Sequence, residues 1–103
     1  MGSLKVAFSR LARRDLEHIV SYIARDNPFD AERLGLRLVA RALDLASPAI
    51  ASAGSILKSS GGARKLIEGP YLIIYDLFPD SEKVRVLRFW HTARKPDHLR
   101  LGR

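Results

Sequence analysis

The sequence predicts an α+β domain with an N-terminal strand, an antiparallel helical hairpin and a three-stranded antiparallel meander, the helices packed on one face of the sheet. Two stretches with helical periodicity lie between residues 9 and 48, and two dense apolar segments, 71–78 and 83–90, lie in the last third. The 103 residues fit a single domain, 1–103, and the 47% hydrophobic content supports a packed core.

The first half of the chain begins with a short alternating segment, Leu4–Phe8, that predicts a strand. Ser9 is a suitable cap for a first helix, and Asn27 with Pro28 predicts that a second helix begins almost at once and ends before Pro48. The first helix carries its apolar residues at Ala12, Leu16, Ile19, Val20 and Ile23. The second has a main stripe at Ala31, Leu34, Leu38, Ala42 and Leu45, which Leu36, Val39, Leu43 and Ala46 widen. The short connection makes the two helices antiparallel neighbours.

In the second half, residues 47–62 are rich in Ser, Ala and Gly and predict a loop. A hairpin of 63–68 and 71–78 follows, and 83–90 is the final strand. The strand 71–78 is apolar on both faces, which is typical of a strand that is covered on both sides. Two helices can cover one face, so the loop, the C-terminal tail, another copy of the chain or a partner protein must cover the other, and we expect a partner.

Composition restricts the function classes. The chain has no cysteine, no apolar run of membrane-spanning length and no signal-peptide pattern, so a reducing cytoplasm is expected. The three histidines lack ligand-like spacing, and neither a metal nor a cofactor is expected. The net charge is +7, with ten Lys/Arg against five Asp/Glu in residues 51–103. This asymmetry favours a polyanionic partner, although charge also serves solubility.

The end of the final strand gathers cations, an aromatic ring and a histidine. If the strand is regular, Arg88 shares a face with Val86 and Trp90, where it either pairs with Asp76 or Glu68 or has a functional role. His91 either makes a local hydrogen bond or acts in proton transfer. We expect target binding from Arg88, His91, Arg94 and Lys95.

Three stretches, in order, resemble RelE/ParE-type toxins of bacterial type II toxin–antitoxin systems. They are Asp15–Ile23 with Asn27-Pro28 and Ala31, then Gly69–Tyr75, then Val86–Arg88 running on to His91–Arg94. Within this superfamily, the spacing from Tyr22-Ile23 to Asn27-Pro28 and the His-x-Ala-Arg exit are most similar to the ParE branch.

The resemblance to ParE implies a toxin that inhibits growth by binding DNA gyrase rather than by cleaving nucleic acid, with no catalytic residues. It also implies a hetero-oligomeric complex with a ParD-type antitoxin, whose acidic C-terminal segment folds onto the toxin. The residues expected in that interface are Tyr75, Val86, Trp90 and Arg94.

Two alternatives stay open. A RelE-like toxin would cleave mRNA on the ribosome without a metal, using Arg64, Lys65, Arg88 and His91 for proton transfer and phosphate stabilisation. Many such nucleases carry a tyrosine near the chain end, but the last tyrosine here is Tyr75. The other alternative is a non-toxic binding module that only forms the antitoxin complex.

Overall fold

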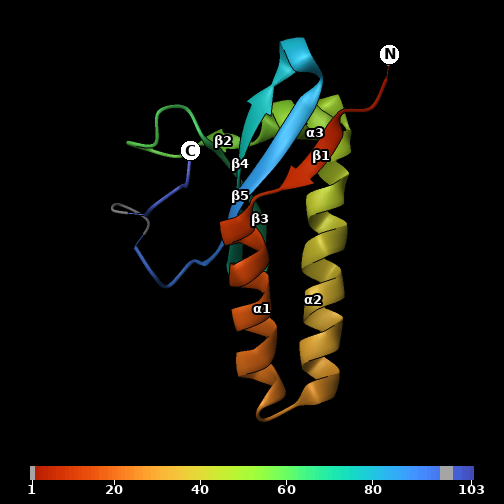
Figure 1. The fold of residues 1–103 in the computed structure, drawn as a ribbon, viewed down its shortest axis with the longest axis vertical. Helices are drawn as coiled ribbons and strands as arrows, with labels where there is room; N and C mark the ends of the chain where they lie inside the picture. Colours follow the sequence, from red (N-terminus) through yellow and green to blue (C-terminus); the bar gives the residue numbers. More distant parts are fainter. Residues whose placement is uncertain (1, 96–98) are drawn as a thin grey trace.

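The computed structural model describes residues 2–95 and 99–103 of the chain. It is an elongated α+β domain, 43 × 30 × 22 Å, in which a helical hairpin packs on one face of a five-stranded sheet and extends beyond it (Figure 1). The predicted fold class is therefore confirmed.

The helical hairpin consists of α1 (Arg10–Ala24) and α2 (Pro28–Leu43). The Ser9 hydroxyl accepts a hydrogen bond from the Ala12 amide, and the Asn27 side chain accepts one from the Asp30 amide, so both predicted caps are present. Helix α2 ends five residues before Pro48 because a 3₁₀ turn, Asp44–Ala46, follows it directly.

The widened stripe that the sequence predicted on α2 is wrong in part. Leu36 is 65% exposed and Leu43 is 49% exposed, whereas Leu38 and Ala42 are fully buried. The two exposed leucines project from the side of α2 that faces away from the sheet.

The sheet has the strand order β1-β5-β4-β3-β2. Its centre is the predicted meander of β3 (Arg64–Glu68), β4 (Tyr71–Phe78) and β5 (Lys83–His91), in antiparallel pairs. Strand β1 (Lys5–Phe8) pairs in parallel with β5 at one edge, and the two-residue β2 (Ser55–Ile56) pairs with β3 at the other.

The segment predicted as a loop contains further structure. A short helix α3 (Pro48–Ala53) precedes β2, and the hydroxyl of the buried Tyr75 donates a 2.6 Å hydrogen bond to the Ala51 carbonyl oxygen. Gly54 follows α3 at a point where an added Cβ would lie 1.9 Å from that hydroxyl oxygen. The small side chains in this segment therefore allow α3 to pack closely on β4.

The register of β5 against β4 shifts between Ile74 and Tyr75. Tyr75 pairs with Val86 and Ile74 pairs with Arg88, which leaves Leu87 as the extra residue of a bulge. Val84, Val86 and Phe89 lie on the helical face of the sheet, whereas Arg88 and Trp90 lie on the other face. The expectation that Arg88 shares a face with Val86 is wrong, because it assumed a regular strand.

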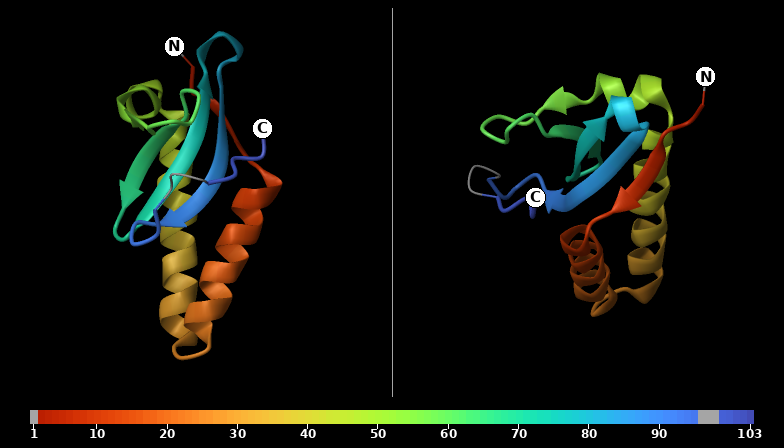
Figure 2. Two further views of the ribbon diagram at one scale, coloured as in Figure 1. Left: turned by 90° about the vertical axis from the view of Figure 1, so that its left-hand side faces the viewer. Right: turned by 45° about the horizontal axis from the view of Figure 1, so that its top comes forward.

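The second face of the sheet is covered by the chain itself over its central part. Leu57 and Ala63 from the loop, and Leu99 and Leu101 from the C-terminal segment, pack on Leu72, Ile74 and Leu87. Figure 2 shows the C-terminal segment crossing the face opposite the helices. The expectation that a partner must cover this face is wrong for these positions, since Ile74 and Leu87 are fully buried.

Candidate functional site

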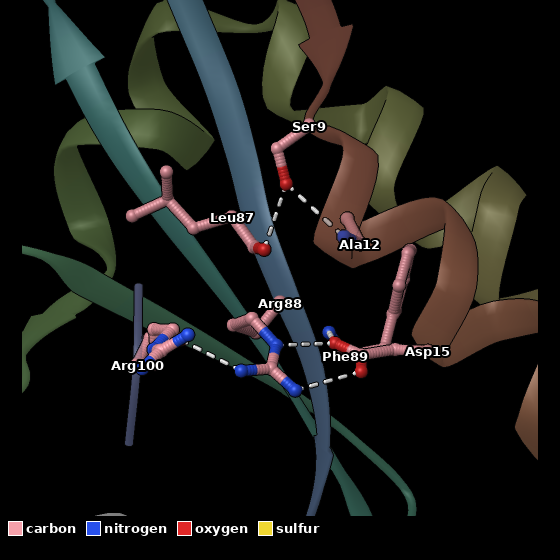
Figure 3. Close-up of polar contacts among 7 residues, drawn as sticks. All are labelled: Ser9, Ala12, Asp15, Leu87, Arg88, Phe89 and Arg100. Atoms are coloured by element: carbon pink, nitrogen blue, oxygen red, sulfur yellow. Dashed lines mark hydrogen bonds and ion pairs between the residues drawn. The ribbon is translucent and has the colours of Figure 1, made fainter. Parts of the chain in front are cut away.

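Arg88 is held by Asp15 of α1, a partner that the sequence did not predict. Its Nε and Nη2 donate to the two Asp15 carboxylate oxygens at 2.6 and 2.8 Å (Figure 3). The same carboxylate accepts the Phe89 amide at 3.1 Å, and the third guanidinium nitrogen, Nη1, donates to the Arg100 carbonyl oxygen at 2.7 Å. Both side chains are about one-seventh exposed, at 13% and 14%. Arg88 therefore joins α1, β5 and the C-terminal segment.

The two carboxylates that were expected to pair with Arg88 have other arginine partners. Asp76 forms a two-pronged ion pair with Arg103, at 2.6 and 2.8 Å, and Glu68 lies 3.2 Å from Arg37 of α2. The expectation failed because the bulge and the α1 contact depend on three-dimensional packing that strand periodicity does not contain.

His91 lies on the opposite face of the sheet from Arg88. It pairs with Tyr71, whose ring it meets edge-on at 5.2 Å between centroids, and its Nδ1 accepts a 3.0 Å hydrogen bond from the Ala93 amide. That bond places the proton of the neutral ring on Nε2. Burial raises the pKa of the Tyr71 hydroxyl above its ordinary value of 10, while Arg37 partly opposes the shift.

The four residues of the nuclease alternative are divided between the two faces. Lys65 and Arg88 flank Ile74 in one row across the sheet, on the second face. Arg64 pairs with Tyr75 on the helical face, where its Nη1 donates to the carbonyl oxygens of Ser52 and Gly54 at 3.2 and 2.8 Å. The free chain therefore does not bring these four side chains together.

Trp90 and Arg94 form a compact tip at the end of β5. The Trp90 Nε1 donates a 2.9 Å hydrogen bond to the Arg94 carbonyl oxygen, and the Arg94 guanidinium stacks 4.3 Å from the centre of the indole ring. Arg94 and Lys95 are exposed, whereas Trp90 is half-buried. This tip presents two cations from a turn fixed by an aromatic ring.

Two of the residues expected in an antitoxin interface are not surface residues. Tyr75 and Val86 are fully buried in the core between the sheet and the helices. We correct this expectation: their side chains cannot contact a partner on the free chain, while Trp90 and Arg94 remain accessible.

An apolar surface that the sequence did not assign to function lies on the helical hairpin. Phe29, Leu36 and Leu43 are 81%, 65% and 49% exposed and follow one another at seven-residue intervals along α2. Beside them a groove of about 490 Å³ is lined by Val6, Ala7, Phe8, Arg13, Leu16, Val39 and Phe89. The seven-residue spacing was visible in the sequence, but its exposure was not.

Other site types are not indicated by the described part of the chain. Residues 2–95 and 99–103 contain no group of three His, Asp or Glu side chains arranged for a metal ion. Within the same residues, no helix has the length and apolar character needed to cross a membrane. The surface features are therefore charged and apolar patches on a small domain.

Comparison with known proteins agrees with this architecture. No curated protein matches the chain significantly. The toxin–antitoxin complex RelBE2 from Mycobacterium tuberculosis aligns with a TM-score of 0.67 and 26% identity, over 91% of this chain and 97% of that chain. The chromosomal ParDE system from P. aeruginosa shares the fold, with a TM-score of 0.74 and 18% identity over 86% of this chain and 96% of that one. A sequence model of the ParE toxin of the type II toxin–antitoxin system parDE matches residues 6–96. The chain therefore belongs to the ParE toxin family of type II toxin–antitoxin systems.

Proposed function

We propose that this toxin inhibits DNA gyrase by binding it and is neutralised by a ParD-type antitoxin in a cytoplasmic hetero-oligomeric complex. The observation that carries the proposal is membership of the parDE toxin family over residues 6–96. The tip of β5 supplies the target contact: Arg94 and Lys95 are exposed cations, and Arg94 is positioned by Trp90.

The division of polar side chains between the two faces supports binding over RNA cleavage. Metal-independent cleavage needs a base, an acid and phosphate-stabilising cations around one phosphate. Here His91 lies on one face, while Lys65 and Arg88 lie on the other. All three nitrogens that Arg88 can donate from are also engaged, by Asp15 and the Arg100 carbonyl oxygen.

The antitoxin surface that fits best is the outer side of α2 with the adjoining groove. Phe29, Leu36 and Leu43 provide apolar area of the kind that is covered when an extended segment folds on its partner. Arg33, Arg37 and Arg41 follow one another at four-residue intervals along the neighbouring side of α2 and suit an acidic segment. Trp90 and Arg94 form a second contact on the other side of the molecule.

A RelE-like ribonuclease is the second candidate, because the RelBE2 complex is similar at 26% identity. For RNA cleavage, a group on the second face, beside Lys65 and Arg88, would have to act as the acid or base in place of His91. The third candidate is a protein that has lost its toxic activity and only binds the antitoxin.

Gyrase supercoiling in vitro separates these candidates. The full-length toxin, made by cell-free synthesis, is titrated into purified gyrase with relaxed plasmid, and the product topoisomers are resolved by electrophoresis. The proposal predicts dose-dependent loss of supercoiling that added ParD-type antitoxin reverses. Supercoiling that is unchanged at a large excess of folded toxin would rule the proposal out.

The residues are tested by the pair Arg94→Ala and Lys95→Ala, made together. We expect this double variant to lose gyrase inhibition and to keep most of its antitoxin affinity, because the main antitoxin surface on α2 is unchanged. The matched control is Lys5→Ala with Arg25→Ala, which removes one lysine and one arginine from β1 and from the connection between α1 and α2. Equal loss in both variants would mean that inhibition depends on net charge rather than on the tip of β5.

A further inference from the structure

Two adjacent cavities form one arginine-lined surface that the tip of β5 does not include. The larger, about 770 Å³, lies at the end of β4 and the start of β5 and is lined by Gly61, Gly62, Arg64, Asp76, Leu77, Phe78, Pro79, Arg85 and Arg103. The smaller, about 340 Å³, lies at the start of α1 and is lined by Ser9, Arg10, Leu11, Arg14, Arg85, Arg100 and Gly102. Arg85 lines both cavities, so they adjoin at this side chain. We call Arg10, Arg14, Arg85 and Arg100, with the flanking Arg64 and Arg103, the arginine surface.

Four of these six side chains form no direct ion pair in the described structure. Arg103 is paired with Asp76, and the Arg64 guanidinium is bound to carbonyl oxygens. For Arg10, Arg14, Arg85 and Arg100, no salt bridge forms with any carboxylate of residues 2–95 and 99–103. Asp76 is the cross-strand neighbour of Arg85 and is already bound by Arg103, so the arginine surface keeps an excess of positive charge that a bound anion would neutralise.

The arginines at the start of α1 are electrostatically unfavourable for the free chain. The first five residues of α1 include Arg10, Arg13 and Arg14 and no acid. A helix N-terminus carries partial positive charge and favours carboxylates, so arginines there destabilise the helix. The C-terminal segment brings Arg100 to the same place, where Gly102 lies beside Leu11. The chain thus concentrates cations where its own fold disfavours them.

The chemistry of the lining favours a phosphate backbone over a folding protein segment. Leu11 is the only large apolar side chain that lines the smaller cavity. In the larger cavity Leu77, Phe78 and Pro79 lie beside three arginines, whereas six of the seven residues that line the groove beside α2 are apolar. The planar guanidinium fork matches phosphate oxygens, and phosphate contacts need little apolar burial. An acidic antitoxin segment that folds on binding instead requires apolar surface.

We propose that the arginine surface binds the phosphate backbone of duplex DNA, so that the toxin contacts gyrase-held DNA as well as gyrase itself. This inference rests on the proposed function for its biological setting, but DNA binding by the toxin is measurable without gyrase.

The test is fluorescence anisotropy of a labelled 20-base-pair duplex with the full-length toxin over a series of NaCl concentrations. Four phosphate contacts predict that the logarithm of the binding constant falls with the logarithm of salt at a slope of about −3.6. Neutralising two of them, with Arg14→Gln and Arg85→Gln together, should reduce the slope to about −1.8 and weaken binding at least about tenfold at low salt. Arg10→Gln with Arg100→Gln repeats the test if the first variant does not fold, and thermal unfolding checks both.

The matched control, Arg25→Gln with Arg33→Gln, removes equal charge near the connection of the hairpin and should keep wild-type DNA binding within about twofold. Arg25 lies about 22 Å along α1 from Arg10, and Arg33 lies in the first turns of α2. Three results would each overturn the inference. The first is equal weakening of DNA binding in the control, and the second is tighter binding to single-stranded RNA than to the duplex. The third is that the arginine-surface variants lose antitoxin binding but keep DNA binding. Gyrase inhibition without DNA binding would overturn it and leave the proposed function intact. DNA binding without gyrase inhibition would support the inference and overturn the proposed function.

Discussion

Replacing Asp15 by alanine should destabilise the toxin more than any exposed charge change. The substitution leaves the Arg88 guanidinium, whose side chain is 13% exposed, without its counter-ion and leaves the Phe89 amide without its acceptor. Removing one partner of a buried ion pair costs about 3–5 kcal/mol, and partial exposure places this pair at the lower end. We therefore expect the free energy of unfolding to fall by about 3 kcal/mol.

Urea unfolding followed by circular dichroism measures this change, and thermal unfolding should show a melting temperature lowered by roughly 12–24 °C. Glu68→Ala is the control, because its two arginine partners, Arg37 at 3.2 Å and Arg41 at 3.6 Å, are 56% and 32% exposed and stay solvated without it, and pairs of this kind contribute about 0–1 kcal/mol. Arg88→Met should recover part of the loss in the Asp15→Ala background, since it removes the unpaired charge. A loss below about 1 kcal/mol for Asp15→Ala would refute the view that this pair joins α1, β5 and the C-terminal segment.

Three further predictions concern α3, β4 and the start of α1. Gly54→Ala should destabilise the fold by about 2–3 kcal/mol in urea unfolding, because its Cβ would overlap the Tyr75 hydroxyl. Gly2→Ala, whose Cβ would lie 3.8 Å from its nearest neighbour, tests the glycine replacement without the overlap. Burial raises the pKa of Tyr75 in the folded state. The neutral hydroxyl therefore stabilises the fold fully below the unfolded pKa near 10, and this stabilisation is lost as the pH rises through the folded pKa. The free energy of unfolding of the wild type should fall more steeply above pH 10 than that of Tyr75→Phe. Arg14→Glu should raise the free energy of unfolding by about 0.5–1 kcal/mol while it weakens DNA binding, and a loss of stability would contradict the assigned effect of the helix dipole.

Much of the fold followed from local sequence patterns. Ser9, Asn27 and Pro28 define the helix starts through hydrogen bonds and backbone geometry that act within three residues, and the structure has them as predicted. The strand 71–78 was predicted with its observed bounds because seven of its eight residues are apolar or aromatic and Gly69-Pro70 and Pro79 flank it.

The site was less predictable because its geometry depends on contacts between distant segments. The bulge at Leu87 reverses the faces of Arg88 and Trp90, and no local pattern in 83–90 marks it. The partner of Arg88 comes from a helix 73 residues earlier in the chain. The exposed Leu36 looked like core, since helical spacing does not say which side of a wide apolar stripe meets the sheet.

The most direct measurement of the central claim, binding to gyrase rather than cleavage of RNA, uses cells in which expression of the toxin is induced. Plasmid topology and the 5′ ends of several mRNAs are followed in the same culture during the first minutes of growth arrest. We predict that plasmid supercoiling is lost while the mRNA ends stay unchanged, and that Arg94→Ala with Lys95→Ala abolishes the effect. New codon-phased mRNA ends with normal plasmid supercoiling would contradict the account.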